Sequence, residues 1–180
     1  EKALKDFTKA IELDSTASNF YDRAYFYNQI EEYDKALTDY NKAIDLDPNE
    51  MDYLYSRADN YYELNEYEKA ISDLLRIIEL DKDGSFVKEE VVYNNLALYY
   101  EGLENYEKAA EYYTKAITIN PDYYLPYRNR ANTYAYDLYD NEKALKDFTK
   151  AIELDSTAYN FYTRAYFYSE IEEYDKALTD

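Results

Sequence analysis

Residues 17–50 read ASNFYDRAYFYNQIEEYDKALTDYNKAIDLDPNE. In the first half, Phe20, Ala24 and Tyr27 stand at i, i+4 and i+7, so they form one stripe along a helix. The second half repeats this spacing from Ala36 onward. A Glu-Glu pair between the stripes leaves room for a tight turn, and a proline near the end stops the second helix because proline cannot continue the hydrogen-bond ladder. The stretch therefore predicts a helix-turn-helix hairpin.

The phrase Tyr-x-Lys-Ala recurs along the chain and marks the second helix of each hairpin. Its alanines, with those of two looser copies, are Ala3, Ala36, Ala70, Ala109, Ala144 and Ala177. They lie 33 to 39 residues apart. A regular period of this size is typical of stacked helical repeats.

The repeat resembles the tetratricopeptide repeat family, whose 34-residue unit has a small residue and a late Tyr in its first helix, Ala and an aromatic in its second, and Pro at its end. Residues 90–123 carry this pattern as Tyr93, Ala97, Tyr100, Tyr106, Ala109, Tyr113, Ala116 and Pro121. The resemblance implies an all-α fold, an α-solenoid of stacked antiparallel hairpins wound as a right-handed superhelix.

We expect one solenoid over residues 1–180. Its complete repeats are 17–50, 51–84, 90–123 and 124–157, its partial repeats are 1–16 and 158–180, and residues 85–89 are an insertion. One extra residue near Asp140 and Asn141 is expected to lengthen a turn.

A second periodicity relates residues 1–39 to residues 142–180. The two stretches differ only at Ser18/Tyr159, Asp22/Thr163, Asn28/Ser169 and Gln29/Glu170. Such near-identity indicates a recent duplication. The chain reads as a window cut from a longer array.

The composition of the chain excludes several classes of function. The net charge of -19 gives a field that repels nucleic acid and anionic lipid, and no apolar run is long enough to insert in a membrane. The same field would attract a basic partner, although acidity can equally serve solubility. With no His, no Cys and no Gly-rich phosphate loop, the sequence predicts neither an enzyme nor a cofactor.

In the resembling family, a concave groove is lined by one face of the first helices, and this face binds peptides. Tyr offers a large contact area and a hydroxyl, so a Tyr-lined acidic groove suits a peptide or protein segment with Arg, Lys or Pro. The alternative is that these rings pack between neighbouring first helices, or that coding bias enriches Tyr. The matching positions are Tyr21, Tyr25, Asn28, Tyr55, Asp59, Tyr62, Glu63, Asn94, Arg128, Asn132, Tyr136, Tyr162 and Tyr166.

Most hairpins carry an arginine on the first helix and an aspartate at one fixed position of the second. The hairpin of residues 90–123 instead has Leu96 and Tyr112. Because one partner left alone near the core would be costly, we expect each arginine to pair with the aspartate of its own hairpin. The expected pairs are Arg23 with Asp39, Arg57 with Asp73, Arg130 with Asp147, and Arg164 with Asp180.

Two further patterns could bind ligands. The spacing of an EF-hand calcium loop is matched by Glu79, Asp81, Asp83, Gly84 and Glu90, although the first ligand is Glu and acidic turns are common in this chain. In some members of the family, a Lys and an Asn one turn apart grip a C-terminal carboxylate. Arg128 and Asn132 resemble that pair, but the next repeat has Tyr159 and Thr163 where cations would be needed.

The chain is therefore predicted to be a non-catalytic scaffold that binds a peptide or protein segment. The alternative is a structural array or self-assembling fibre built by end-to-end stacking of hairpins.

Overall fold

The computed structural model describes residues 2–82 and 84–179, and these contain helices but no strand. The chain forms two compact units, Glu1–Val87 and Lys88–Asp180. The first unit consists of α1 (Lys2–Leu13), α2 (Ala17–Gln29), α3 (Tyr33–Leu46), α4 (Met51–Glu63) and α5 (Tyr67–Leu80). The second consists of α6 (Glu89–Gly102), α7 (Tyr106–Ile119), α8 (Tyr124–Asn132) with a π-helical end η1 (Thr133–Asp137), α9 (Asn141–Leu154), α10 (Ala158–Glu170) and α11 (Tyr174–Ala177).

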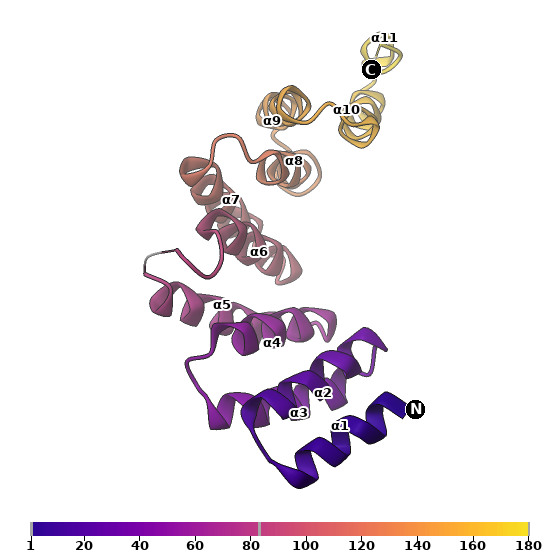
Figure 1. Ribbon diagram of the computed structural model, residues 1–180. Helices are drawn as coiled ribbons and strands as arrows, with labels where there is room; N and C mark the ends of the chain where they lie inside the picture. Colours follow the sequence, from indigo (N-terminus) through magenta and orange to yellow (C-terminus); the bar gives the residue numbers. More distant parts are fainter. Residues whose placement is uncertain (1, 83, 180) are drawn as a thin grey trace. The chain divides into compact units, whose positions relative to one another are not determined.

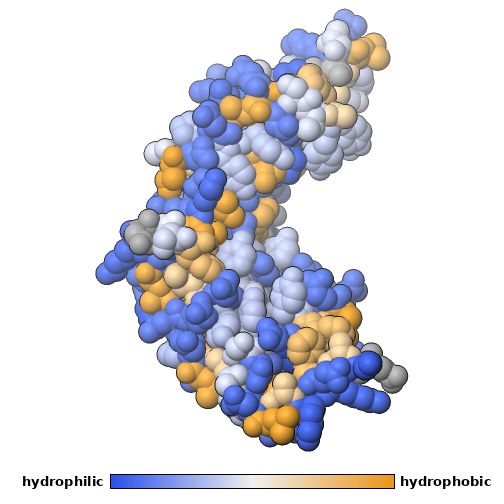
Figure 2. Space-filling view, in the orientation of Figure 1, coloured by the Kyte–Doolittle hydropathy of each residue, from blue (hydrophilic) through white to orange (hydrophobic). Residues whose placement is uncertain are grey.

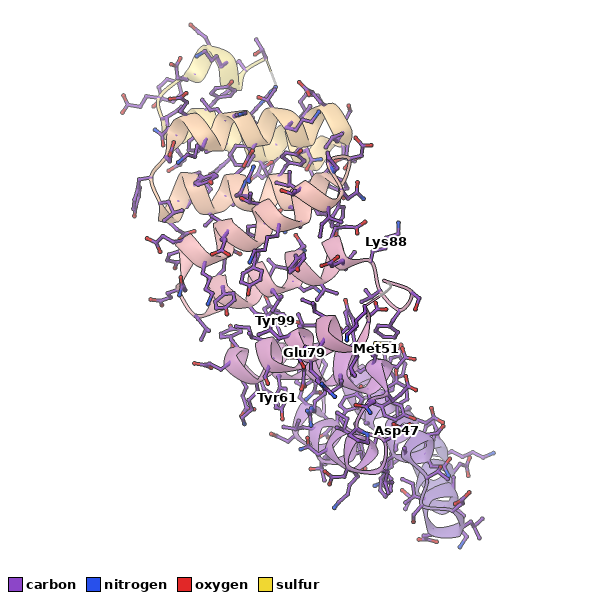
Figure 3. All side chains as sticks on the ribbon, turned by 90° about the vertical axis from the view of Figure 1, so that its left-hand side faces the viewer. Asp47, Met51, Tyr61, Glu79, Lys88 and Tyr99 are labelled. Carbon is purple, nitrogen blue, oxygen red and sulfur yellow. The ribbon has the colours of Figure 1, made fainter. Side chains whose placement is uncertain are left out.

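Each even-numbered helix, here called an A helix, forms an antiparallel hairpin with the odd-numbered B helix that follows it (Figure 1). The predicted all-α fold of stacked hairpins is confirmed. Between hairpins, α3 ends ahead of Pro48, as expected, and the Asp47 N–H still donates to the Ala43 carbonyl at 2.9 Å. Met51 begins α4 a few residues later (Figure 3).

A three-residue turn joins the two helices of each hairpin. In the first hairpin, the Glu31 N–H donates to the Asn28 carbonyl and the Glu32 N–H donates to the Tyr27 carbonyl, both at 3.0 Å. These bonds satisfy carbonyls at the end of the A helix, and they require left-handed backbone at the middle residue. The middle residues are Glu31, Asn65, Glu104, Tyr139 and Glu172, with φ between 54° and 63°. The predicted tight turn is confirmed.

Alanine stripes let the helices of a hairpin approach closely. Ala24 and Ala36 are completely buried against Tyr40, and Tyr21 and Tyr27 pack on the same cluster. The unbranched methyl groups leave room for the large ring without breaking either helix.

The lysine of Tyr-x-Lys-Ala covers a tyrosine late in the A helix of the same hairpin. In the closest example, the Lys108 Nζ lies 4.7 Å from the centre of the Tyr100 ring. An ammonium over a ring face is attracted electrostatically while the ring stays partly buried. The same contact joins Lys35 to Tyr27, Lys69 to Tyr61, Lys143 to Tyr134 and Lys176 to Tyr168.

The extra residue of the α8–α9 hairpin lies in the helix, so the expectation of a longer turn is wrong. Leu138, Tyr139 and Asp140 form the same three-residue turn as elsewhere. The Leu138 N–H instead donates to the Thr133 carbonyl, five residues back, at 2.9 Å. A π-helical turn absorbs one residue without moving the turn that follows.

Candidate binding surface

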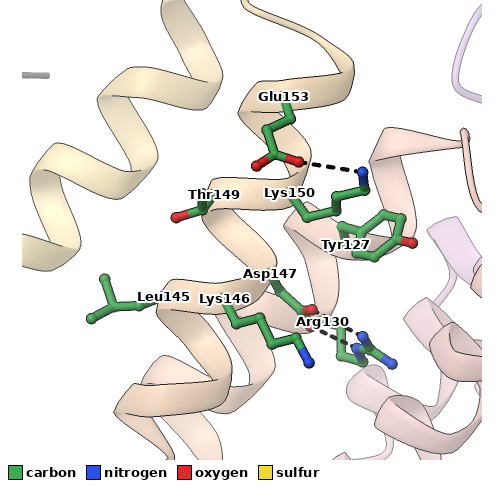
Figure 4. Close-up of a pocket in the computed structure, with 8 residues that line it drawn as sticks. All are labelled: Tyr127, Arg130, Leu145, Lys146, Asp147, Thr149, Lys150 and Glu153. Atoms are coloured by element: carbon green, nitrogen blue, oxygen red, sulfur yellow. Dashed lines mark hydrogen bonds and ion pairs between the residues drawn. The ribbon is translucent and has the colours of Figure 1, made fainter.

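The predicted arginine–aspartate pairs lie between the two helices of a hairpin. Arg57 donates from Nε and Nη2 to the two oxygens of Asp73 at 2.8 and 2.7 Å. Arg23 with Asp39 and Arg130 with Asp147 have the same two-pronged geometry (Figure 4). These pairs are confirmed, whereas Asp180 lies outside the described residues.

Each arginine also reaches back to the preceding B helix with its remaining nitrogen. The Arg57 Nη1 donates to the Asn41 side-chain oxygen at 2.8 Å. The acceptors for Arg23, Arg130 and Arg164 are the hydroxyls of Thr8, Thr114 and Thr149. Each of these arginines therefore links neighbouring helices within a unit. Because the guanidinium groups are used in these contacts, few of their N–H donors are available to a partner.

In the first unit, the expected groove residues lie on the A helices α2 and α4. Tyr21 is half-buried, because its ring lies 4.8 Å from that of Tyr53 and its hydroxyl is 3.2 Å from the Ser56 hydroxyl. Tyr25 and Tyr62 are exposed. Of the others, Asn28, Tyr55 and Asp59 are half-buried and Glu63 is exposed. Tyr53 and Ser56, which sequence reasoning missed, show that packing between A helices uses part of this face.

In the second unit, the structure brings four expected groove residues and two further residues into one hollow, here called the Tyr pocket. It lies between the α8–η1 segment and α10 and has a volume of about 320 Å³. Its lining residues are Asn132, Tyr136, Tyr159, Tyr162, Thr163 and Tyr166. Exposed fractions of 57%, 63% and 49% for Tyr159, Tyr162 and Tyr166 leave their rings accessible.

Arg128 lies at one edge of the Tyr pocket. Its guanidinium carbon is 4.9 Å from the centre of the Tyr159 ring and 5.7 Å from that of Tyr124. Stacking between two rings holds the cation by its planar face.

Asn94 has to be removed from the expected groove residues. It is 4% exposed, and its side-chain oxygen accepts a hydrogen bond from the Asn129 amide at 3.2 Å. Because α8 covers it, Asn94 serves the contact between hairpins and offers a partner almost no surface.

The first unit has a hollow of its own, here called the Phe pocket, between α1 and α2. It is about 410 Å³ and is lined by Phe7, Tyr21, Asp22, Tyr25, Phe26 and Gln29. The duplicated residues Phe148 and Phe167 are buried in the second unit, where the Tyr136 ring packs edge-on against Phe167 at 6.1 Å. The Phe pocket thus exposes apolar surface that the second unit covers.

Sequence reasoning missed a larger cavity of about 670 Å³ between α8 and α9 (Figure 4). Tyr127, Lys146 and Lys150 line it together with the Arg130–Asp147 pair. An equivalent hollow of about 300 Å³ beside Tyr93 and Lys115 shows that this cavity follows from the repeat geometry.

The residues of the expected calcium loop have other partners. The Asp81 carboxylate accepts the backbone N–H groups of Ser85, Phe86 and Val87 at 2.9 to 3.3 Å. Glu79 pairs with Arg76 at 3.0 Å, and Glu90 is buried and accepts from the Asn120 amide at 2.9 Å. Asp83 lies outside the described residues. Within the described ranges, no cluster of three carboxylates is placed to hold a metal ion, so the spacing is better explained by an Asp that anchors the linker ahead of Lys88 (Figure 3).

A half-buried carboxylate, Glu101, lies next to the π-helical turn. Burial raises the pKa of Glu101, while hydrogen bonds from Thr133 and Tyr113 lower it. Burial likewise raises the pKa of Asp137. The Glu101 carboxylate accepts the hydrogen bond of the Thr133 hydroxyl, so it contacts the next A helix.

None of the helices described has the length and apolar composition of a membrane span.

Residues 18–50 and 91–123 match a sequence profile described as tetratricopeptide repeat, and residues 52–83 match a second profile of the same description. No curated protein sequence matches the chain. Among solved structures, MamA from Desulfovibrio magneticus RS-1 is 21% identical with a TM-score of 0.77, covering 88% of this chain and 86% of its own. PilF of Pseudomonas aeruginosa is 22% identical with a TM-score of 0.76, covering 99% and 80%.

YrrB, described as a TPR protein with an unusual peptide-binding site, is 24% identical with a TM-score of 0.67, covering 96% of this chain and 87% of its own. At 21% to 24% identity, these similarities establish the fold only. The profile matches extend over more than half of the sequence and agree with the hairpins seen in both units, so the chain belongs to the tetratricopeptide repeat family, whose fold is typical of non-catalytic protein–protein interaction scaffolds.

Proposed function

We propose that this chain is a non-catalytic scaffold that binds a peptide or protein segment on the exposed face of its A helices. The observation that carries the proposal is the Tyr pocket. Exposed aromatic rings that line one hollow are typical of contact sites, because Tyr combines a large area with few rotatable bonds. YrrB, which shares the fold, is described as having a peptide-binding site.

Charge and ring chemistry define the expected partner class. The net charge of -19 attracts a basic segment and repels nucleic acid. Figure 2 shows hydrophilic residues over much of the surface that it displays. Tyr faces accept both Arg or Lys cations and the flat ring of Pro, so a basic, Pro-containing segment fits best.

The test is an array of 15-residue peptides in which Arg, Lys and Pro contents vary independently. Double substitution Tyr162→Ser/Tyr166→Ser should reduce retention of basic peptides at least tenfold, because two anchor rings are lost. Tyr139→Ser is the matched control, since Tyr139 is 81% exposed and lies in a turn, but does not line the Tyr pocket. Equal retention by both variants would show that binding does not use the A-helix face.

A second candidate function is end-to-end self-association, and the Phe pocket favours it. Hydrophobic surface gathers over α1 and α2 in Figure 2. In the second unit, Tyr136 packs against Phe167, the counterpart of Phe26, so a ring-bearing helix of another copy could cover Phe26 in the same way. Sedimentation velocity distinguishes the two functions: growth of species with concentration, abolished by Phe26→Ser, supports assembly, and a constant monomer rules it out.

A further inference from the structure

The duplicated stretches differ in a way that points to specificity. The four differences between residues 1–39 and 142–180 all fall on the A helices α2 and α10, which occupy about a third of each stretch. The B-helix and turn sequences are identical. The two copies have therefore kept the sequences of their B helices and turns and changed the helix that carries the proposed binding face.

Three of the four differences alter a pocket directly. Tyr159 and Thr163 line the Tyr pocket, where the first copy has Ser18 and Asp22. Gln29 lines the Phe pocket, where the second copy has Glu170. The fourth difference, Asn28 against Ser169, leaves the charge unchanged.

The exchange moves a negative charge along the helix. The first copy has Asp22 and neutral Gln29, whereas the second has neutral Thr163 and Glu170. Positions seven residues apart lie on one helix face, about 10 Å from each other. Each copy therefore carries one carboxylate at these two positions. The carboxylate of the second copy stands two helical turns further along its A helix than that of the first.

Both carboxylates are available and lie beside rings. In the described part of the chain no cation pairs with Asp22 or Glu170, and both are exposed. Asp22 lines a pocket with Tyr25. Glu170 follows Tyr166 by one turn of α10. Glu170 also lies near Tyr136: burial raises the pKa of Tyr136 most, and the charges of Tyr166 and Glu170 raise it further.

We propose that each copy binds a cationic side chain of the partner, beside Asp22 and Tyr25 on α2 and beside Glu170, Tyr136 and Tyr166 on α10, so that the two copies select cations at different heights of the A helix. A guanidinium or ammonium is attracted both by the carboxylate and by the ring faces. The inference rests on the proposed function, because it assigns a ligand class to the same face.

The test uses the full chain and a small probe, N-acetyl-arginine methylamide, with the citrulline analogue as a neutral probe of the same shape. Binding is followed by NMR of the tyrosine ring signals. We expect the arginine probe to shift the signals of Tyr25, Tyr136 and Tyr166, and the citrulline probe to bind about threefold to tenfold more weakly at each.

Two exchange variants give matched controls, because each borrows residues from the other copy. Glu170→Gln should weaken the probe about threefold to tenfold at Tyr136 and Tyr166 while leaving the Tyr25 shift unchanged. Asp22→Thr should do the reverse. The double variant Thr163→Asp/Glu170→Gln recreates on α10 the arrangement of Asp22 and Tyr25, so it should restore the response at Tyr166, the counterpart of Tyr25, that Glu170→Gln alone weakens.

The outcomes separate the inference from the proposed function. If both probes bind equally and the exchange variants change nothing, the carboxylates do not select the ligand, and the scaffold function survives on ring contacts. If the arginine probe shifts no A-helix tyrosine while the peptide array still depends on Tyr162 and Tyr166, the cation sites are refuted alone. If neither assay involves these rings, both proposals fail.

Discussion

Removing one member of the Arg57–Asp73 pair should cost more stability than removing both. The Arg57 guanidinium donates two hydrogen bonds to the Asp73 carboxylate at 2.7 and 2.8 Å, and the two side chains are 18% and 8% exposed. Arg57→Leu leaves an ionised carboxylate buried with two empty acceptor positions. A buried charge left unpaired in this way costs about 3–5 kcal/mol.

The chain supplies its own replacement for the pair. The α6–α7 hairpin has Leu96 and Tyr112 at the corresponding positions, where both are buried. Arg57→Leu/Asp73→Tyr copies that set into the α4–α5 hairpin. Because replacing a buried ion pair by apolar groups is often neutral, the double variant should lie within about 1 kcal/mol of the parent chain.

Native-state hydrogen exchange is the suitable assay, because a repeat array need not unfold in one step. The amide free energies of α4 and α5 should fall by about 3–5 kcal/mol in the single variant and recover in the double variant. Urea unfolding followed by circular dichroism gives an independent ranking. A single variant as stable as the parent, or a double variant as damaged as the single, would refute the reasoning.

Three further changes probe local features. Tyr139→Asn should stabilise the chain by about 0.5–1 kcal/mol in thermal unfolding, because Asn tolerates the left-handed backbone that costs Tyr energy; no gain would mean that the exposed ring makes compensating contacts. Glu101→Gln should raise Tm at neutral pH, because burial raises the folded pKa of Glu101 and ionisation therefore costs stability above that pKa; the gain should fade as pH falls through the raised folded pKa toward the ordinary value of 4.5, and a gain independent of pH would assign the effect to packing. Asp81→Ala should speed hydrogen exchange at residues 85–87 while leaving α4 unchanged, since three backbone amides lose their acceptor, and unchanged exchange would show that Asp81 does not anchor the linker.

The sequence predicted the hairpins and their core because both depend on spacing within one helix. Ala24 on α2, and Ala36 with Tyr40 on α3, lie on apolar stripes with helical spacing, and their burial follows from those stripes. The arginine–aspartate pairs could also be predicted, since the joint change to Leu96 and Tyr112 revealed that the two positions depend on each other.

Features that depend on neighbouring hairpins were predicted less well. The register of α6 places Asn94 on the groove side, but spacing cannot tell how closely α8 approaches, and Asn129 covers it. Counting residues between alanines located one extra residue without deciding between turn and helix. The left-handed residue fixes the turn at three residues, so Tyr139 stays in place and the helix takes the π-helical turn.

The acidic surface of the chain reflects both its composition and the contacts that its basic residues make. Arg23, Arg57 and Arg130 are paired inside hairpins. In several hairpins the lysine of Tyr-x-Lys-Ala both covers a tyrosine and pairs with a carboxylate of the preceding turn, as Lys69 does with Tyr61 and Glu66. Because so many cations hold the repeat together, the excess carboxylates remain at the surface, where a basic partner can approach them. Added salt should therefore lower the affinity for such a partner more than it lowers the stability of the fold, since salt screens exposed charges much more than buried pairs. The opposite result, a partner affinity that does not change with salt and a fold that salt destabilises, would contradict this assignment of the charges.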